Sequence, residues 1–336
     1  MDLTQAEAVI DLIESETAQA AHNAVGQLGG ALRRRIEPVY GSLLDIASQF
    51  YAVVDYPDED VEDLTREEIL RTLSQAEQTL QALLSTAGRG QILRQGVPTA
   101  ILGKPNVGKS SLLNALVGYE RAIVTDIAGT TRDTVEEKAS VGGVLLRLID
   151  TAGIRDASDA VERLGVERAK AAMDGAALLL VVIDGSAPET EEDREILAQA
   201  AGTGKPWIYV ESKRDLSRTR AVSAGTIGGG NAPRAAVRVS SVTGEGLDEL
   251  ESAVAEMFPD GEAPAGEVLT NTRQAEALSR ALEALRGART ALESGLTPDA
   301  VLSDAERAMN ALGEITGQTL REDLTARIFE RFCVGK

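Results

Sequence analysis

One short segment limits what this chain can fold into more than any other, and it is GKPNVGKS at residues 103–110. An apolar run, VPTAIL, comes directly before it, and a helical pattern, SLLNALVG, comes directly after it. This is the motif G-x-x-x-x-G-K-S in the strand-loop-helix context that it requires. A chance glycine-rich turn would lack these flanking elements. The segment therefore predicts a phosphate-binding loop between a strand and a helix.

Each part of this motif has a physical role. Glycines let backbone N–H groups wrap around phosphate oxygens, and the N-terminus of the helix adds the positive end of its dipole. We expect Lys109 to reach the β and γ phosphates and the hydroxyl of Ser110 to bind magnesium. The remaining contacts of this loop to the nucleotide are expected from Asn106, Val107, Gly108 and Ser111.

Two downstream segments are typical of loops that sense a nucleoside triphosphate. GTTRD begins at Gly129 and offers a threonine that can complete the coordination of magnesium. DTAG, which is Asp150, Thr151, Ala152 and Gly153, follows the predicted strand VLLRLI. Asp150 can hold magnesium through water, and the N–H of Gly153 can sense the γ-phosphate.

A third segment predicts the base that is bound. SKRD at residues 212–215 follows the predicted strand PWIYVE, and we expect Ser212, Lys213 and Asp215 to contact the nucleotide. The carboxylate of Asp215 can pair with the N1 and N2 hydrogens of guanine, which adenine does not present. The base is further braced by a segment after the strand AAVRVS, namely Ser240, Ser241 and Val242.

The order of patterns along the chain predicts its architecture. Residues 3–95 have helical periodicity, short apolar runs then alternate with helices, and the chain becomes helical again after residue 270. The middle part predicts an α/β domain with a mostly parallel sheet and helices on both faces. We expect it to be inserted into one all-helical domain formed from both chain ends. The expected parts are helical 1–95, α/β 96–258, and a linker with the second helical part at 259–336.

Composition excludes several classes of function. One cysteine excludes an intramolecular disulfide, and one histidine excludes a multi-histidine metal site within the chain. No apolar run is long enough for a membrane span, so we expect a cytoplasmic protein without membrane contact. The net charge of −19 excludes a surface that is basic overall, although patches such as Arg33–Arg35 remain.

Together the nucleotide motifs resemble the translation-factor class of GTPases over residues 96–258. The pattern of that class at the base site is Asn-Lys-x-Asp, and Ser212 takes the place of the asparagine, so the guanine preference rests mainly on Asp215. In Ras-like enzymes a glutamine after DTAG orients the attacking water, but this chain has Ile154 there. Another group must act, and the segment that follows leaves four candidates open: Asp156, Asp159, Glu162 and Glu167.

A closer resemblance covers nearly the whole chain. The segments TDIAGTTRD and DTAGIRDASDAVERLGVERA, the split helices and the ending FCVGK resemble the MnmE (TrmE) family of tRNA modification GTPases. The resemblance implies that Glu162 is the catalytic glutamate and positions water as two G domains meet face to face. It implies that Thr131 joins Ser110 on magnesium. Potassium would replace an arginine finger, bound by Asn106 and by the loop at Thr125, Ile127 and Thr130. The GTP contacts of this loop would be Thr125, Asp126, Ile127, Ala128, Gly129, Thr130 and Thr131.

The same resemblance implies the larger reaction. GTP hydrolysis would drive modification of C5 of the wobble uridine in certain tRNAs, together with a flavin-dependent partner, MnmG (GidA). A folate, 5-formyl-tetrahydrofolate, would supply the one-carbon unit, and Lys336 matches a folate-contacting position. Cys333 is assigned either as a catalytic thiol or as a small residue that is buried or lies beside the folate.

The family begins with a folate-binding and dimerising domain, and this chain starts where that domain would end. We therefore expect little folate binding and weakened dimerisation, with self-association through the G domain when nucleotide is bound. We expect tRNA contact to depend on the partner protein or on small basic patches. Two alternatives remain: an Era-like GTPase switch in ribosome assembly, and a scaffold that binds GTP without turnover.

Overall fold

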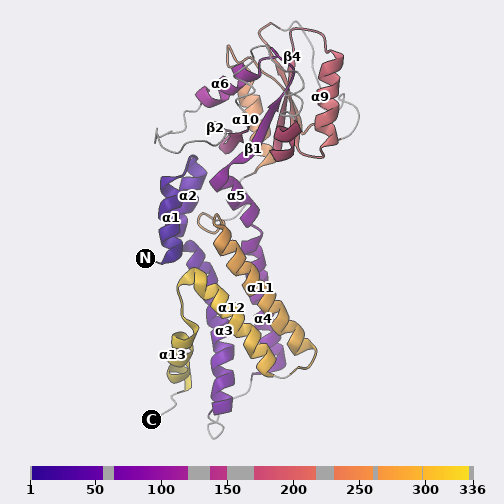
Figure 1. The fold of residues 1–336 in the computed structure, drawn as a ribbon. Helices are drawn as coiled ribbons and strands as arrows, with labels where there is room; N and C mark the ends of the chain where they lie inside the picture. Colours follow the sequence, from indigo (N-terminus) through magenta and orange to yellow (C-terminus); the bar gives the residue numbers. More distant parts are fainter. Residues whose placement is uncertain are drawn as a thin grey trace. The chain divides into compact units, whose positions relative to one another are not determined.

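The chain forms two compact units in a computed structural model, which describes residues 2–55, 64–119, 137–149, 170–216, 231–259, 264–296 and 298–332. The first unit takes residues 1–15, 19–94 and 262–336. The second takes residues 16–18 and 95–261. The first unit is thus assembled from both ends of the chain (Figure 1), and the second is inserted between them.

The first unit is helical. Its helices are α1 (Leu3–Ile13), α2 (Ala18–Leu28), α3 (Ala31–Asp55), α4 (Arg66–Leu84), α5 (Ala87–Gln95), α11 (Thr272–Glu293), α12 (Pro298–Thr316) and α13 (Leu320–Phe332). Helix α11 packs along both α4 and α12, and α12 packs along α3 (Figure 1). Among the helices that the structure describes, none combines the length and apolar character needed to cross a lipid bilayer.

The start of α4 shows how local sequence sets a helix boundary. Thr65 is the N-cap residue, and its hydroxyl accepts a hydrogen bond from the backbone N–H of Glu68. The Glu68 carboxylate in turn accepts from the Thr65 N–H at 3.0 Å. This reciprocal capping box satisfies two donors that the first turn of a helix leaves unpaired. The sequence TREE at residues 65–68 has the spacing of a capping box and so predicts a helix start, which the structure confirms.

The core of this unit is built from aliphatic stripes. Leu278, Leu282 and Leu285 of α11 are at most 3% exposed and belong to the same buried cluster as Leu73 and Leu80 of α4. Burying one such side chain contributes about 1.5–3 kcal/mol. Because the two helices come from opposite ends of the chain, this cluster can form only when both ends meet.

A forked ion pair also joins the two chain ends. The guanidinium of Arg273 in α11 donates to both carboxylate oxygens of Glu7 in α1, at 2.7 and 2.8 Å. The amide of Gln274, which is fully buried, donates to the same carboxylate at 2.9 Å. Thr4 adds a bond from its hydroxyl to the carbonyl of Ile315 at 2.7 Å. Two-point geometry of this kind fixes orientation as well as distance.

The second unit contains a sheet with the strand order β2-β3-β1-β4-β5-β6. Neighbouring strands are parallel except for the antiparallel pair β2 and β3. The strands are β1 (Val97–Leu102), β2 (Glu137–Val141), β3 (Val144–Leu148), β4 (Leu178–Asp184), β5 (Trp207–Ser212) and β6 (Ala235–Arg238). The helices of this unit include α6 (Lys109–Tyr119), α9 (Glu191–Gly202) and α10 (Leu247–Met257).

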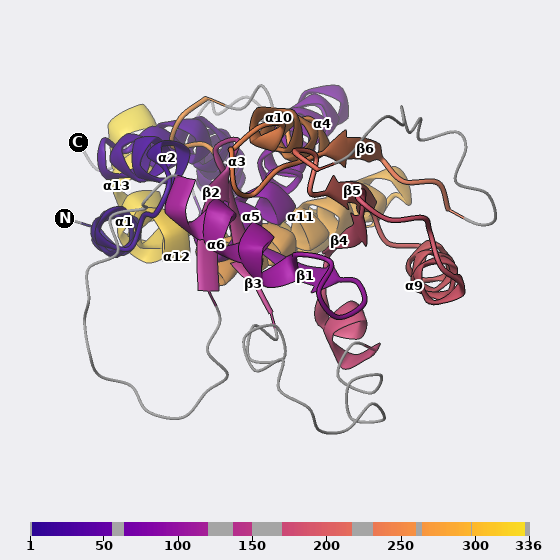
Figure 2. The same cartoon turned by 90° about the horizontal axis from the view of Figure 1, so that it is seen from above.

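Helices cover both faces of this sheet. On β4, Leu179, Val181 and Ile183 belong to a buried cluster with Leu197 and Ala200 of α9. The intervening residues of β4 are also buried, so neither face of the strand is open to water. Figure 2 shows α9 and α10 on opposite sides of the sheet. Burial on both faces is why these strands are continuous apolar runs rather than alternating ones.

The predicted fold class is confirmed: a mostly parallel α/β domain is inserted into an all-helical domain formed from both chain ends. Sequence reasoning missed β2, whose sequence EKASV contains two charged residues. Only Ala139 and Val141 of this strand are buried. It is an edge strand of the sheet, and such a strand needs only every second side chain to be apolar.

Two glycines in α5 give a matched test of packing in the helical unit. A Cβ at Gly90 would lie 1.7 Å from the carbonyl oxygen of Leu269, whereas a Cβ at Gly88 would meet nothing within 4 Å. Gly90→Ala should therefore lower the free energy of unfolding by about 3 kcal/mol, because the backbone must move. Gly88→Ala should be neutral or stabilise by up to about 1 kcal/mol. Urea unfolding followed by circular dichroism at 222 nm checks this, and equal midpoints for the two variants would contradict it.

Candidate nucleotide site

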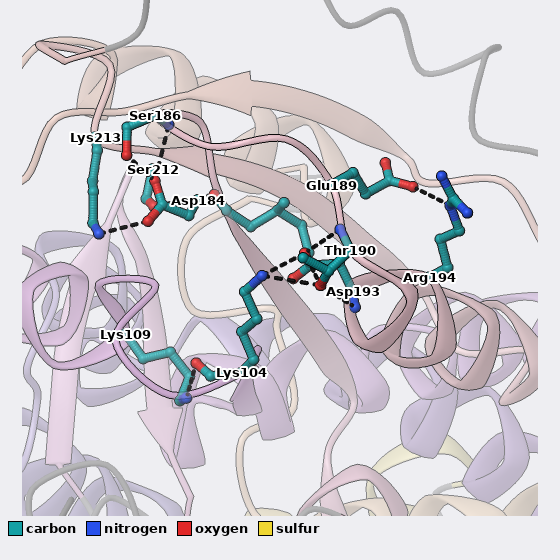
Figure 3. A network of polar contacts seen from close by, with 11 residues as sticks. Lys104, Lys109, Asp184, Ser186, Glu189, Thr190, Asp193, Arg194, Ser212 and Lys213 are labelled. Carbon is teal, nitrogen blue, oxygen red and sulfur yellow. Dashed lines mark hydrogen bonds and ion pairs between the residues drawn. The ribbon is translucent and has the colours of Figure 1, made fainter.

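The site lies where parallel strands end. The phosphate loop follows β1, Asp184 ends β4, Ser212 ends β5, and Ser240 lies just after β6. Carboxyl ends of parallel strands lie at one edge of a sheet, where α/β proteins bind ligands. Segments more than 100 residues apart in sequence, at 107 and 212, are in direct contact there. Figure 3 shows the polar side chains along this edge.

The phosphate loop holds its backbone in conformations that few residues adopt. Gly103 and Gly108 have φ of 147° and 101°, and Asn106 has φ of 64°. A Cβ at Gly103 would lie 2.4 Å from the carbonyl oxygen of Val182. Glycine is therefore required at this position both for its torsion angles and for the close approach of β4. The result is an open backbone cradle at the N-terminus of α6, which fits a phosphate group.

Lys109 is held on the loop itself. Its ammonium donates to the carbonyl oxygens of Gly103 at 2.6 Å and Lys104 at 2.8 Å. Burial lowers the pKa of Lys109, and the nearby charge of Glu192 partly opposes this shift. Phosphate oxygens would compete with the two carbonyls for the same ammonium. The lysine thus lies beside the cradle, as the motif predicts.

Ser212 ties the base segment to the phosphate loop. The side chain is 2% exposed, and its hydroxyl oxygen lies 2.5 Å from the carbonyl oxygen of Val107 and 3.1 Å from that of Ile183. A hydroxyl has one hydrogen to donate, so the closer carbonyl takes it. The asparagine that Ser212 replaces has two amide hydrogens and a carbonyl oxygen. Ser212 can therefore brace the loop, but it has no second hydrogen for the base.

Lys213 is positioned by β4. Its backbone is left-handed, with φ of 57°, and its ammonium lies 2.6 Å from Asp184 Oδ2. Asp184 also accepts from the N–H of Ser186 at 2.9 Å. Burial raises the pKa of Asp184, but the hydrogen bonds from Lys213 and Ser186 outweigh it and hold the pKa below its usual value. This carboxylate stays charged and fixes the lysine at the end of β5.

Asp215 is exposed and held from one side. The hydroxyl of Ser240, which is fully buried, donates to Asp215 Oδ1 at 2.7 Å. Ser240 in turn accepts from the backbone N–H of Thr243 at 3.2 Å. The buried serine sets the direction of an exposed carboxylate, as recognition of a base edge requires. Of the segment predicted to brace the base, Ser241 is half-buried and Val242 is exposed beside it.

The described residues offer a hydroxyl ligand for magnesium rather than a protein cage. Ser110 lies in the first turn of α6, beside the cradle. Within the ranges that the structure describes, no group of three or more His, Cys, Asp or Glu residues is arranged to hold a metal ion. The hydroxyl of Ser110 fits magnesium, which proteins commonly hold through one or two side chains together with substrate phosphates and water.

Several predicted site residues lie outside the described ranges. They are Thr125, Asp126, Ile127, Ala128, Gly129, Thr130, Thr131, Asp150, Thr151, Ala152, Gly153, Glu162, Cys333 and Lys336. Among the described ones, Asn106, Val107, Gly108, Lys109, Ser110 and Ser111 form the loop and the start of its helix. Sequence reasoning missed Asp184, which fixes Lys213, and the pair Lys104 and Asp193. The spacing of Thr190 and Asp193 matches a helix start, but nothing in it indicates a contact with the phosphate loop.

The fold and this site define a P-loop protein of the GTPase class, and comparisons with known proteins give the family. A family model described as the MnmE helical domain matches residues 3–333. The tRNA modification GTPase MnmE of Listeria innocua serovar 6a is 43% identical, over 100% of this chain and 73% of that relative. The MnmE of Lactococcus lactis subsp. lactis is 43% identical, over 100% of this chain and 72% of its own length. The chain belongs to the MnmE family of tRNA modification GTPases.

Solved structures were also found to be similar. The G domain of the T. maritima FeoB iron transporter is 28% identical and covers 47% of this chain and 96% of its own, with a TM-score of 0.34. Aquifex aeolicus Era bound to GDP and aluminium fluoride is 28% identical, over 55% of this chain and 65% of its own, with a TM-score of 0.34. The family assignment, and with it the enzyme class of GTPase, rests on the relatives that match the whole chain.

The hydrogen bond from Ser212 to the Val107 carbonyl predicts an effect on nucleotide affinity. Ser212→Ala removes the donor to the Val107 carbonyl, so the phosphate loop should be less well held. We expect nucleotide affinity to fall about five- to tenfold, the equivalent of roughly 1 kcal/mol for one hydrogen bond. Ser252→Ala is the matched control, because that exposed hydroxyl donates to the carbonyl of Asp248 within α10. Titration of a fluorescent GDP measures both, and equal affinities for the two variants would contradict the brace.

Proposed function

We propose that this chain binds GTP at the loop of residues 103–110, hydrolyses it, and so drives modification of C5 of the wobble uridine in certain tRNAs. The observation that carries the proposal is the contact between Ser212 and Val107, which joins the base segment to the phosphate loop. With these two parts in contact, one nucleotide can reach both the cradle and Asp215. Family membership supports the link to tRNA.

Recognition of the nucleotide is divided between two ends of the site. The backbone cradle and Lys109 bind the phosphates, and the charge of Lys109 offsets the negative charge that builds there during hydrolysis. Asp215 binds the edge of guanine, and Ser240 keeps its carboxylate in position. Lys213, two residues before Asp215, is held in place by Asp184. Magnesium, held by Ser110 and Thr131, would neutralise charge on the β and γ phosphates.

Hydrolysis requires a group that positions water and a cation that replaces an arginine finger. Ile154 follows DTAG and cannot accept a hydrogen bond from water, so another group must fill the first role, and the resemblance to the MnmE family assigns it to Glu162. Potassium, bound by Asn106, Thr125, Ile127 and Thr130, would supply positive charge between the β and γ phosphates. Asn106 fits this role in its position, because it is exposed at the turn of the phosphate loop. Pairing of two G domains would bring Glu162 into place.

The negative net charge of the chain supports the proposal that tRNA is bound mainly by a partner protein. The net charge of −19 opposes a polyanion, and the three consecutive arginines have partners within the chain. Arg33 lies 3.9 Å from Glu37, Arg34 donates to the carbonyl of Gly29, and Arg35 lies 3.7 Å from Glu267. We therefore assign most tRNA contact to a flavin-dependent partner, MnmG (GidA). The folate role of Lys336 and the role of Cys333 remain predictions of the family resemblance.

The two alternatives have less support. An Era-like switch in ribosome assembly would be favoured by an appended basic module, whereas the relatives that match this whole chain are tRNA modification GTPases. A scaffold without turnover would be favoured by Ser212 and Ile154. Ser212 nevertheless keeps its contact with the loop, and Glu162 offers an acceptor for water.

Guanine recognition by Asp215 can be tested by changing both partners. Asp215→Asn replaces an acceptor with a donor, and xanthine carries an oxygen where guanine carries its N2 amino group. Affinity for GDP should fall at least about tenfold, and affinity for the xanthine nucleotide should rise, because the site is built for one hydrogen-bond pattern. Asp248→Asn, on the exposed side of α10, is the control. Loss of both affinities together would indicate a folding defect and not a change in recognition.

The proposed mechanism of hydrolysis is tested by exchanging potassium for sodium and by removing the carboxylate of Glu162. Hydrolysis in potassium chloride should exceed that in sodium chloride of equal ionic strength by at least about tenfold. Glu162→Ala should lower kcat by about a hundredfold with little change in nucleotide affinity. Glu167→Ala is the matched control in the same segment. Equal rates in the two salts would exclude potassium as the replacement for an arginine finger. An equal effect of both alanine variants would exclude a special role for Glu162.

A further inference from the structure

A buried ion pair joins the phosphate loop to α9, and none of the roles given above to the nucleotide motifs accounts for it. The ammonium of Lys104, the second residue of the phosphate loop, lies 2.7 Å from Asp193 Oδ2 in the first turn of α9 (Figure 3). The Asp193 side chain is 1% exposed and that of Lys104 is 18% exposed. Charged side chains are buried to this degree only when they are paired.

Asp193 is itself held rigidly. The same oxygen, Oδ2, accepts from the N–H of Thr190 at 2.9 Å and from its hydroxyl at 2.7 Å. The ammonium of Lys104 also lies 3.0 Å from the Thr190 hydroxyl. Burial raises the pKa of Asp193, but the bonds from Lys104 and Thr190 outweigh it, so the pKa lies below its usual value. The carboxylate is therefore charged and fixed at the N-terminus of α9.

Lys104 also contacts the residue that would bind phosphate. Its backbone carbonyl accepts from the ammonium of Lys109 at 2.8 Å, while its own ammonium points to Asp193. The loop is therefore fastened at two places, through the side chain of Lys104 near its start and through the carbonyl of Val107 near its end. Between these two points lies Asn106, whose left-handed backbone costs energy and must be maintained by the surroundings.

We infer that Lys104 is a positioning residue for nucleotide binding, which acts by fastening the phosphate loop to α9 through Asp193. The inference rests on the proposed binding of GTP at this loop. Removing the pair lets the cradle relax, so the nucleotide must order the loop as it binds and affinity falls. Coupling of this kind is reciprocal, so a bound nucleotide stabilises the first turn of α9.

The test compares three variants of the pair with one control. Lys104→Met keeps the apolar stem and removes the charge, Asp193→Asn removes the opposite charge and keeps the shape, and Lys104→Arg keeps the charge. Arg194→Met is the control, because it removes the exposed pair that Arg194 forms with Glu189 on the same turn (Figure 3). The full chain is used throughout, with fluorescent GDP as the probe, and thermal unfolding is followed by circular dichroism.

Lys104→Met and Asp193→Asn should each raise the Kd for GDP about tenfold. The Kd of the double variant should be no higher than that of the weaker-binding single variant, because the same interaction is removed in each case. KM for GTP should rise while kcat changes less than about threefold. Lys104→Arg should restore affinity to within about threefold, and Arg194→Met should leave it unchanged. Hydrogen exchange at residues 191–193 should slow when GDP is added to the unmodified chain and not to Lys104→Met.

Other outcomes overturn the inference. A lower melting temperature with an unchanged Kd, measured well below that temperature, would make the pair structural only. Equal losses of affinity in Lys104→Arg and Lys104→Met would show that the ion pair is not what matters. If Lys104→Met does not fold, Asp193→Asn and Lys104→Arg decide the question alone. Failure of the unmodified chain to bind GDP would instead refute the proposed function.

Discussion

A phosphate loop must hold its backbone in torsion angles that most residues avoid, and in this chain neighbouring strands and one helix supply the restraint. Gly103 lies so close to β4 that any side chain would collide with the Val182 carbonyl. Ser212 at the end of β5 holds the Val107 carbonyl, and Asp193 on α9 holds the side chain of Lys104. The parallel sheet brings these groups to one edge. The nucleotide site is thus a property of the whole sheet and not of the loop alone.

The helical unit solves a different problem, because its two halves are separated in sequence by the α/β unit. Aliphatic stripes on α4 and α11 supply the apolar area between the two halves. The forked contact between Arg273 and Glu7 fixes how α11 lies against α1, since two parallel hydrogen bonds form at only one relative position. The amide of Gln274, which is fully buried, donates a further hydrogen bond to the Glu7 carboxylate.

Much of this arrangement could be predicted from sequence, and the failures have physical causes. The phosphate loop, the buried strands and the start of α4 depend on residues within a short window, so their patterns are visible locally. The strand β2 was missed because an edge strand needs few apolar residues. The sequence shows what Ser212 lacks relative to asparagine, but it does not show the contact with Val107, which spans 105 positions. The pair of Lys104 and Asp193 depends on the packing of α9 against the sheet, which no spacing along the chain reveals.

The split construction of the helical unit also has a consequence for synthesis. Chains emerge from the ribosome at about 5–20 residues per second, so α11 follows α4 and α5 by on the order of ten to forty seconds. During that time the α/β unit is synthesised, while the apolar faces of α3 and α4 have no partner from the second half. The nascent chain must therefore keep these leucine-rich helices from associating with other proteins until its last quarter appears. At the end of that interval, every new molecule of this protein has a complete nucleotide-binding unit and a helical unit that still lacks its second half.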